Sequence, residues 1–267
     1  MFFVRSLIFL FSFYILHADS TAILQQADNA YQKKEYLQAF SQYKILADQN
    51  NSAALQKIGL MYELGKGCDQ NYTLAKQYYT KASELGNIDA HYNLGLLFQM
   101  SKDYNQSISY YTYAADKGHT ASQHNLANLY ELTNPPYQDL KKACHYYQMA
   151  SENNFTLSQL PLATMYVLGK GCDKNETKAL LLYKSVLLHK DSQEAQHNAA
   201  LMIARGLGMP QNNILAYALW ENNANLGYEP SKYNAAVLKK RMDPIDLSKA
   251  QALAKNRKKM IEMIIAK

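Results

Sequence analysis

The chain carries a small residue at intervals of 32 to 37 residues, followed in most intervals by an aromatic or large apolar residue three positions later. Positions three apart lie on one face of an α-helix. Each interval therefore predicts a helix that packs closely on a neighbour at its small residue and buries the large one. The small residues are Ala27, Gly59, Gly95, Ala127, Ala163, Ala200 and Ala236.

A second small residue follows in most intervals, with a bulky pair three and four residues later, as in Ala75 with Tyr78-Tyr79. This spacing predicts a second amphipathic helix. In three intervals a Gly-x-Gly sequence separates the two helices, and glycine there can take the positive φ that ends a helix and reverses the chain. The expected turn glycines are Gly65, Gly67, Gly169, Gly171, Gly206 and Gly208.

These units resemble Sel-one-like repeats (SLRs), relatives of tetratricopeptide repeats. IGLMYELGKGCDQNYTLAKQYYTKASELG, residues 58–86, and LATMYVLGKGCDKNETKALLLYKS, residues 162–185, carry the resemblance most fully. It covers residues 24–236 and implies an all-α fold, a right-handed α-solenoid of about six stacked helix-turn-helix hairpins. Residues 237–267 are expected to form basic capping helices.

Prolines depart from the repeat pattern at two places. Thr133-Asn134-Pro135-Pro136 stands where a glycine loop is expected, so a rigid turn replaces it. Pro161 falls inside a first helix. If that helix starts at Ser158, Pro161 lies in its first turn, where a missing amide hydrogen costs little.

The first residues have the layout of a secretory signal peptide: Arg5, an apolar run from Leu7 to Leu16, and Ala18. We expect a signal peptide at residues 1–18, with cleavage as late as Ala22, and export to the periplasm or the medium. The alternative is an uncleaved membrane anchor, although the run is short for a bilayer span.

Three cysteines, Cys68, Cys144 and Cys172, are an odd set, so at least one thiol stays unpaired under oxidising conditions. Cys68 and Cys172 occupy equivalent positions three repeats apart, too far to bond to each other. We therefore expect all three to fill space in the core. The GKGC sequences lack the spacing of a phosphate-binding loop, and no clustered Cys and His residues predict zinc. No cofactor or metal is expected.

Asparagines recur two residues before the small residues, at Asn93, Asn125, Asn198 and Asn234. First helices line the concave face of such solenoids, so these amides could bind the backbone of an extended peptide. Alternatively, asparagine belongs to the repeat consensus and bonds an adjacent helix. His124 and His197 are candidate groove residues on the same helices, two units apart and therefore unsuited to sharing a metal.

Charge concentrates at the C-terminal end. The residues after Val237 carry nine Lys and Arg against three Asp and Glu, a balance equal to the +6 of the whole chain. This end could contact anionic lipid or an acidic partner. The alternative is a solvated capping helix with cations near its C-terminus. Nucleic acid is not expected as a partner.

No nucleophile elbow, paired carboxylates or cofactor motif is present. We expect a non-enzymatic scaffold that binds an unknown protein or peptide through its concave groove, and relatives with such roles act in signalling, envelope assembly and host interaction. One alternative is a β-lactam-binding or β-lactam-hydrolysing enzyme, as the resemblance implies for cysteine-rich members, although those carry paired cysteines in successive repeats. Another is a membrane-surface module that uses the basic end.

Overall fold

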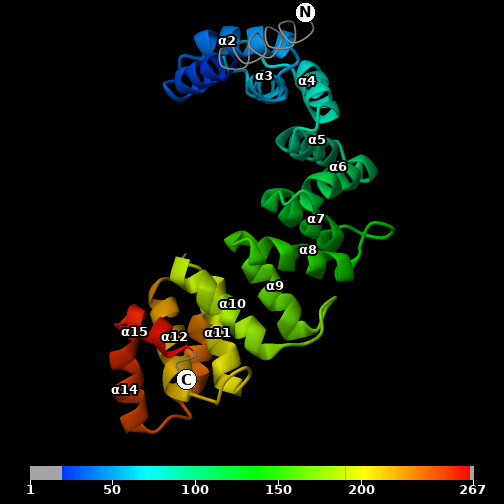
Figure 1. The fold of residues 1–267 in the computed structure, drawn as a ribbon. Helices are drawn as coiled ribbons and strands as arrows, with labels where there is room; N and C mark the ends of the chain where they lie inside the picture. The colour runs from blue at the N-terminus through cyan, green and yellow to red at the C-terminus, as the bar shows by residue number, and fades with distance from the viewer. Residues whose placement is uncertain (1–19, 190, 265–267) are drawn as a thin grey trace, which may run out of the picture. The chain divides into compact units, whose positions relative to one another are not determined.

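The computed structural model describes residues 20–189 and 191–264. The expected signal peptide at residues 1–18 lies outside the described residues. Every regular element within them is helical, and the helices pack as successive hairpins, which confirms the predicted all-α repeat fold (Figure 1). The chain divides into two compact units, Met1–Ser122 and Gln123–Lys267.

Unit 1 begins with a helix whose described part covers residues 20–32. α3 packs on α2 and pairs with α4, and α5 packs on α4 and pairs with α6. α7 (Thr120–Leu132) runs across the boundary between the units. The other helices of unit 1 are α2 (Tyr36–Asp48), α3 (Ser52–Leu64), α4 (Tyr72–Glu84), α5 (Ile88–Met100) and α6 (Tyr104–Asp116).

Unit 2 continues the hairpins and then departs from them. α9 packs between α8 and α10, α11 packs on α10 and pairs with α12, and α12 is covered by α13, α14 and α15. The helices are α8 (Leu140–Glu152), α9 (Thr156–Leu168), α10 (Glu176–His189), α11 (Gln193–Arg205), α12 (Asn213–Asn225), α13 (Glu229–Lys239), α14 (Pro244–Ala254) and α15 (Arg257–Met263).

Asparagine and aspartate side chains start many of the helices. Asn51, for example, precedes α3, and its side chain accepts a hydrogen bond from the backbone N–H of Ala54. Such a cap satisfies one of the free amides of the first turn and contributes about 1 kcal/mol. The same arrangement begins α4, α5, α6, α8 and α12, at Asn71, Asn87, Asp103, Asp139 and Asn212.

In the α3–α4 and α5–α6 hairpins, the small residue of the first helix faces a tyrosine of the second helix. A Cβ at Gly59 would lie 2.7 Å from the Tyr79 ring, and one at Gly95 would lie 2.5 Å from the Tyr111 ring. The rings therefore occupy the space that the small residues leave, as expected from the spacing. Tyr79 is fully buried and its hydroxyl donates to Glu63 Oε2 at 2.6 Å. Tyr43, Tyr79, Tyr111, Tyr147 and Tyr183 are all buried at this position of the second helix, and buried Trp220 takes it in α12.

The glycine loops lie against the preceding hairpin. A Cβ at Gly67 would sit 2.4 Å from the carbonyl oxygen of Tyr36, and one at Gly171 would sit 2.0 Å from that of Leu140. Both contacts are with the first residue of the previous second helix. Glycine is required there because both the backbone approach and the positive φ exclude a side chain.

Two local expectations are wrong. α9 starts at Thr156, so Pro161 is its sixth residue and lies beyond the first turn, where a proline removes a helical hydrogen bond. Ala236 is exposed although its predicted role is that of a packed small residue. The reason is that α14 packs on α12, so no second helix covers the Ala236 face of α13.

The C-terminal segment is fastened to earlier helices of unit 2. Arg257 donates to the carbonyl oxygen of Leu187 at 3.0 Å and pairs with Asp191 at 2.6 Å. Asn222 Nδ2 donates to the carbonyl oxygen of Ala254 at 3.0 Å. α14 and α15 thus cover the last hairpin and hold the end of α10.

Candidate functional site

The four asparagines of the predicted groove have different surroundings. Asn93 is 9% exposed, and its buried Nδ2 has no hydrogen-bond partner among the described residues. Asn198 forms a hydrogen bond with the hydroxyl of Tyr183 on the neighbouring α10. Asn125 and Asn234 are half-buried. Asn198 therefore does what the consensus alternative describes, since it bonds an adjacent helix.

The two predicted groove histidines join consecutive hairpins of unit 2. His124 Nδ1 lies 2.9 Å from Ser158 Oγ, and His197 Nδ1 lies 3.0 Å from Ser231 Oγ. Each serine is 34 residues further along the chain than its histidine. Burial lowers the pKa of both imidazoles. These rings are committed to inter-hairpin hydrogen bonds and stay neutral at physiological pH.

The six turn glycines all have positive φ. In the third loop, a Cβ at Gly208 would lie 2.6 Å from the carbonyl oxygen of Glu176, the first residue of α10. Gly206 ends α11 in the left-handed conformation, as Gly65 ends α3 and Gly169 ends α9. These residues shape the hairpins, and Gly171 also lines a cavity beside α8.

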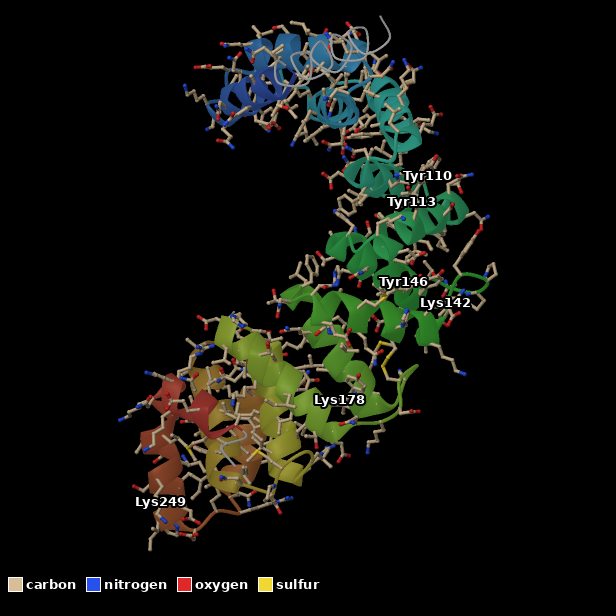
Figure 2. The ribbon with its side chains drawn as sticks, in the orientation of Figure 1. Tyr110, Tyr113, Lys142, Tyr146, Lys178 and Lys249 are labelled. Carbon is tan, nitrogen blue, oxygen red and sulfur yellow. A yellow bond between two sulfur atoms is a disulfide. The ribbon has the colours of Figure 1, made fainter. Side chains whose placement is uncertain are left out.

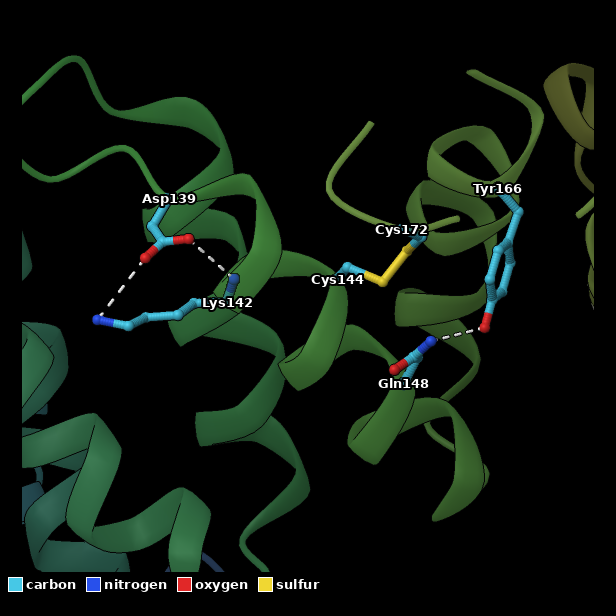
Figure 3. Close-up of a disulfide and its surroundings, with 6 residues drawn as sticks. All are labelled: Asp139, Lys142, Cys144, Gln148, Tyr166 and Cys172. Carbon is cyan, nitrogen blue, oxygen red and sulfur yellow. Dashed lines mark hydrogen bonds and ion pairs between the residues drawn. A yellow bond between two sulfur atoms is a disulfide. The ribbon is translucent and has the colours of Figure 1, made fainter. Parts of the chain in front are cut away.

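Cys144 is buried in the core, as expected, but the expectation that Cys144 and Cys172 fill space as separate thiols is wrong, because these two residues form a disulfide (Figure 3). They lie 28 residues apart, with Cα atoms separated by 5.7 Å. The sequence comparison considered only cysteines at the same position of different repeats, such as Cys68 and Cys172. Cys144 and Cys172 hold different positions in successive repeats, so that comparison does not find them. Cys144 sits in a second helix and Cys172 in the loop of the next hairpin, and the close contact of Gly171 with Leu140 brings them together. That contact depends on how hairpins stack.

Cys68 is the free cysteine of the described chain, in agreement with an odd set. It is half-buried and packs, as Phe40 does, against the hydrophobic core cluster of unit 1. Burial, with a smaller effect of Asp69, raises the pKa of its thiol. A raised pKa reduces the thiolate population, so Cys68 is a poor nucleophile.

A groove opens next to the disulfide, between α8 and α10, and we call it the disulfide groove. Its polar part is a cavity of 370 Å³ and its apolar part a cavity of 250 Å³. Gln148, Tyr166 and Lys178 line both parts. Lys141, Cys144, Cys172 and Asp173 contribute to the polar part, and Glu152, Leu162, Leu181 and Leu182 contribute to the apolar part.

Tyr166 forms the floor between the two parts of the groove. This residue of α9 is 7% exposed, and its hydroxyl accepts a hydrogen bond from Gln148 Nε2 at 2.7 Å (Figure 3). Lys178 Nζ lies 5.6 Å from the centre of the Tyr166 ring. The preceding hairpin repeats this arrangement, with Lys142 Nζ 5.1 Å from the Tyr130 ring. Ammonium groups over aromatic faces are held by cation–π attraction.

The lysines around the groove differ in their partners. Lys142 pairs with Asp139 at 3.7 Å, as Figure 3 shows. Lys141 and Lys178 are exposed and have no carboxylate partner within the described residues. Figure 2 labels Lys178 and Lys142 on unit 2. Two ammonium groups at the polar part are therefore free to meet an anion.

Unit 1 holds a cavity of similar construction. It measures 660 Å³ and is lined by Tyr72, Thr73, Lys76, Leu97, Phe98, Met100 and Ser101. Lys76 Nζ lies 4.3 Å from the Phe98 ring, which stacks on Tyr110 with centroids 5.4 Å apart. Met100 is 69% exposed. None of the six predicted groove residues lines this cavity or either part of the disulfide groove.

The basic C-terminal end is partly neutralised. Lys249 pairs with Asp246 at 2.9 Å, and Lys258 lies 3.9 Å from Glu262. Arg257 is engaged with Asp191 in unit 2. Within residues 20–189 and 191–264, no helix is long and apolar enough to cross a membrane, and no three His, Cys, Asp or Glu residues gather as metal ligands.

The Sel1 repeat family matches residues 52–87, 88–119, 120–155, 157–185 and 193–228. No curated protein matches the chain. A crystal structure of a protective antigen of uropathogenic Escherichia coli with an SLR fold is 24% identical, with a TM-score of 0.72 over 91% of this chain and 54% of that one. The chain thus spans about half the length of that antigen. A Sel1 repeat protein of Oxalobacter formigenes is 26% identical, with a TM-score of 0.68 over 76% of this chain and 84% of that one.

Proposed function

Because the chain belongs to the Sel1 repeat family, we propose that it is a scaffold that binds a protein or peptide partner and performs no catalysis. The hairpins display side chains at regular positions along each unit, which suits an extended partner better than a small substrate.

One observation carries this proposal. Each unit has an open cavity in which apolar side chains lie beside a lysine held over an aromatic ring, Lys76 over Phe98 in unit 1 and Lys178 over Tyr166 in unit 2. Aromatic residues in pockets, surrounded by polar groups, are typical of the residues that dominate protein interfaces. These cavities are the first candidates for contact with a partner.

The asparagine-bearing first helices are the second candidate surface. Asn93 supports it, because its unpartnered amide could donate to a peptide carbonyl after a small movement of the side chain. Asn198 gives this surface less support, because its side chain already bonds Tyr183. The two surfaces predict different sets of damaging substitutions.

Export is part of the proposal. The Cys144–Cys172 disulfide supports it, because disulfides persist in the periplasm and outside the cell and are rare in the cytosol. The Cys68 thiol would remain unpaired there, protected by burial.

The test is capture of partners with the full chain from an extract of its source cells, followed by titration of each purified partner by calorimetry. The titration compares the unsubstituted chain with Tyr166→Ala, Phe98→Ala and Asn93→Ala/Asn125→Ala. We expect a stoichiometric complex that a cavity substitution weakens. Absence of any saturable complex would contradict the scaffold function, and turnover of a chromogenic β-lactam by the purified protein would contradict its non-enzymatic part.

Binding to anionic vesicles is the assay for the membrane alternative. The ion pairs of Lys249, Arg257 and Lys258 reduce the free positive charge of the C-terminal end. We therefore expect weak vesicle binding that disappears at physiological salt, where surface charges are screened beyond about 8 Å.

A further inference from the structure

We propose that the disulfide groove binds a partner segment in which an apolar side chain is followed by carboxylates, and that the Cys144–Cys172 bond is needed to form its polar end. This inference rests on the proposed scaffold function and identifies the chemistry of one of its sites.

The apolar end of the groove has room for one or two side chains. Its 250 Å³ is smaller than the pockets of drug-sized ligands, which measure about 300–1,000 Å³. Leu162 lies 3% exposed below it, whereas Leu181 is 47% exposed at its edge. Covering Leu181 with a leucine or phenylalanine of a partner would remove apolar surface from water on both molecules.

The polar end offers two ammonium groups to an anion. Lys141 and Lys178 line its 370 Å³ cavity, and neither has a carboxylate partner within the described residues. Lys141 is the second residue of α8, and the Asn175 side chain caps the start of α10. Both helices thus begin at this end, and their positive dipole ends add to the charge of the lysines.

The groove is polarised along its length. Glu152, the last residue of α8, lines only the apolar part, Lys141, the second residue of α8, lines only the polar part, and Lys178 lies between them and lines both. Asp173 is the acidic residue that lines the polar part. A carboxylate placed beside Glu152 would be repelled, so the acidic residues of the partner should extend towards Lys141 and its apolar residue should lie over Leu181.

The charge density excludes a polyanion as the natural partner. The two lysines are balanced by Asp173 and Glu152 over the whole groove, and Lys142 is already paired with Asp139. A phosphate backbone or an anionic membrane would need a continuous cationic surface. Two spaced ammonium groups beside an apolar cavity instead fit discrete carboxylates on a peptide.

The disulfide forms one wall of the polar end. It ties Cys172, in the loop that supplies Asp173 and Asn175, to α8, which supplies Lys141. Without this bond, the loop would be held to α8 by packing alone, including the approach of Gly171 to Leu140. Binding should therefore be weaker in the reduced protein, which couples this site to an oxidising compartment.

The test measures fluorescence polarisation of short labelled peptides with the full chain. One peptide has leucine followed by three glutamates in a Gly-Ser background, a second has glutamines in place of the glutamates, and a third has serine in place of the leucine. We expect the first to bind at least fivefold more tightly than the others, and its binding to weaken with salt. Equal binding of the glutamate and glutamine peptides would overturn the proposal.

Matched substitutions place the peptide on the protein. Lys141→Gln/Lys178→Gln should weaken the glutamate peptide two- to tenfold, the range expected for two exposed charge pairs. Lys142→Gln is the control on the same helix and should leave binding unchanged, because that ammonium pairs with Asp139. If Lys142→Gln weakened peptide binding as much as Lys141→Gln/Lys178→Gln, or if anionic vesicles bound as tightly as the peptide, the attraction would be nonspecific. Either result would overturn the proposed binding site.

The redox arm compares oxidised protein, dithiothreitol-treated protein and Cys144→Ser/Cys172→Ser, at a temperature where circular dichroism shows each to be folded. Both bond-free forms should bind the glutamate peptide at least threefold more weakly, and unchanged binding would remove the disulfide from the proposal.

The groove inference and the scaffold function can fail separately. If a captured partner binds Lys141→Gln/Lys178→Gln as tightly as the unsubstituted chain, the groove inference fails and the scaffold function stands. If the chain captures no partner but binds the peptide at these lysines, the groove stands and the wider scaffold role fails.

Discussion

Cys144 and Cys172 link the second helix of one hairpin to the loop of the next, with their Cα atoms 5.7 Å apart. The bond therefore joins two successive hairpins and does not lie within a single hairpin. It therefore stabilises the stacking of hairpins, the part of a repeat fold that holds adjacent units together.

Removing this disulfide should destabilise unit 2. For Cys144→Ser/Cys172→Ser we expect a loss of about 2–4 kcal/mol in the free energy of unfolding, because the unfolded chain regains the freedom that the bond removes. Guanidinium denaturation monitored by circular dichroism measures it. Cys68→Ser is the control and should cost less than half as much, and equal losses would show that the bond contributes nothing of its own.

The N-terminal hairpins offer a place for an equivalent bond. Gly67 approaches Tyr36 as Gly171 approaches Leu140, and Phe40 occupies the position in α2 that Cys144 occupies in α8. We expect Phe40→Cys to pair with Cys68, so that thiol titration of the denatured, oxidised protein falls from one free thiol to none. Two free thiols in Phe40→Cys, with one in Phe40→Ala, would show that the two loops stack differently.

Gly59→Ala should be destabilising although alanine is favoured over glycine in a helix by about 1 kcal/mol. The added Cβ would lie 2.7 Å from the Tyr79 ring, and such overpacking costs about 1–3 kcal/mol. Thermal and denaturant unfolding measure the change. In a Tyr79→Leu background the cost should shrink, because the clash with the ring is gone. The same cost in both backgrounds would place its origin elsewhere.

The stability of unit 2 should fall in mild acid. Burial lowers the pKa of His124 and of His197, so the folded state binds fewer protons than the unfolded state, whose imidazoles titrate near 6.5. Their contribution is complete above that value and is lost as the pH falls through it towards the folded pKa. The difference in unfolding free energy between the unsubstituted chain and His124→Asn/His197→Asn should therefore be smaller at pH 5 than at pH 7.5. A constant difference would contradict this linkage.

The predictions that held depend on spacing along one or two neighbouring helices. Gly59 and Gly95 are small because a tyrosine of the paired helix fills their place, and this pattern is visible in the chain as a small residue followed by a bulky pair. The Gly-x-Gly turns are equally local, because positive φ is a demand of single residues. Local spacing and turn glycines are therefore enough to predict the hairpins, their order along the chain and the repeat family.

The predictions that failed depend on where a helix starts and on which helix packs against it. Pro161 would lie in a first turn only if α9 started at Ser158, but α9 starts at Thr156, after Phe155, which makes no side-chain cap hydrogen bond. Ala236 was assigned a partner helix that the chain does not provide, because α14 packs on α12. The asparagine surface stays a prediction, and none of its four asparagines lines the disulfide groove.

The sequence by itself determined the helical hairpin, its repetition and the membership in a repeat family, because each rests on helix periodicity, small residues and turn glycines that act over short distances. Tertiary structure alone decided that Cys144 bonds Cys172, that His124 and His197 tie hairpins together, and that a groove opens beside Tyr166. Those features depend on the offset with which one hairpin stacks on the next. That offset is set by many packed side chains at once, such as the approach of Gly171 to Leu140, and no single stretch of the chain encodes it.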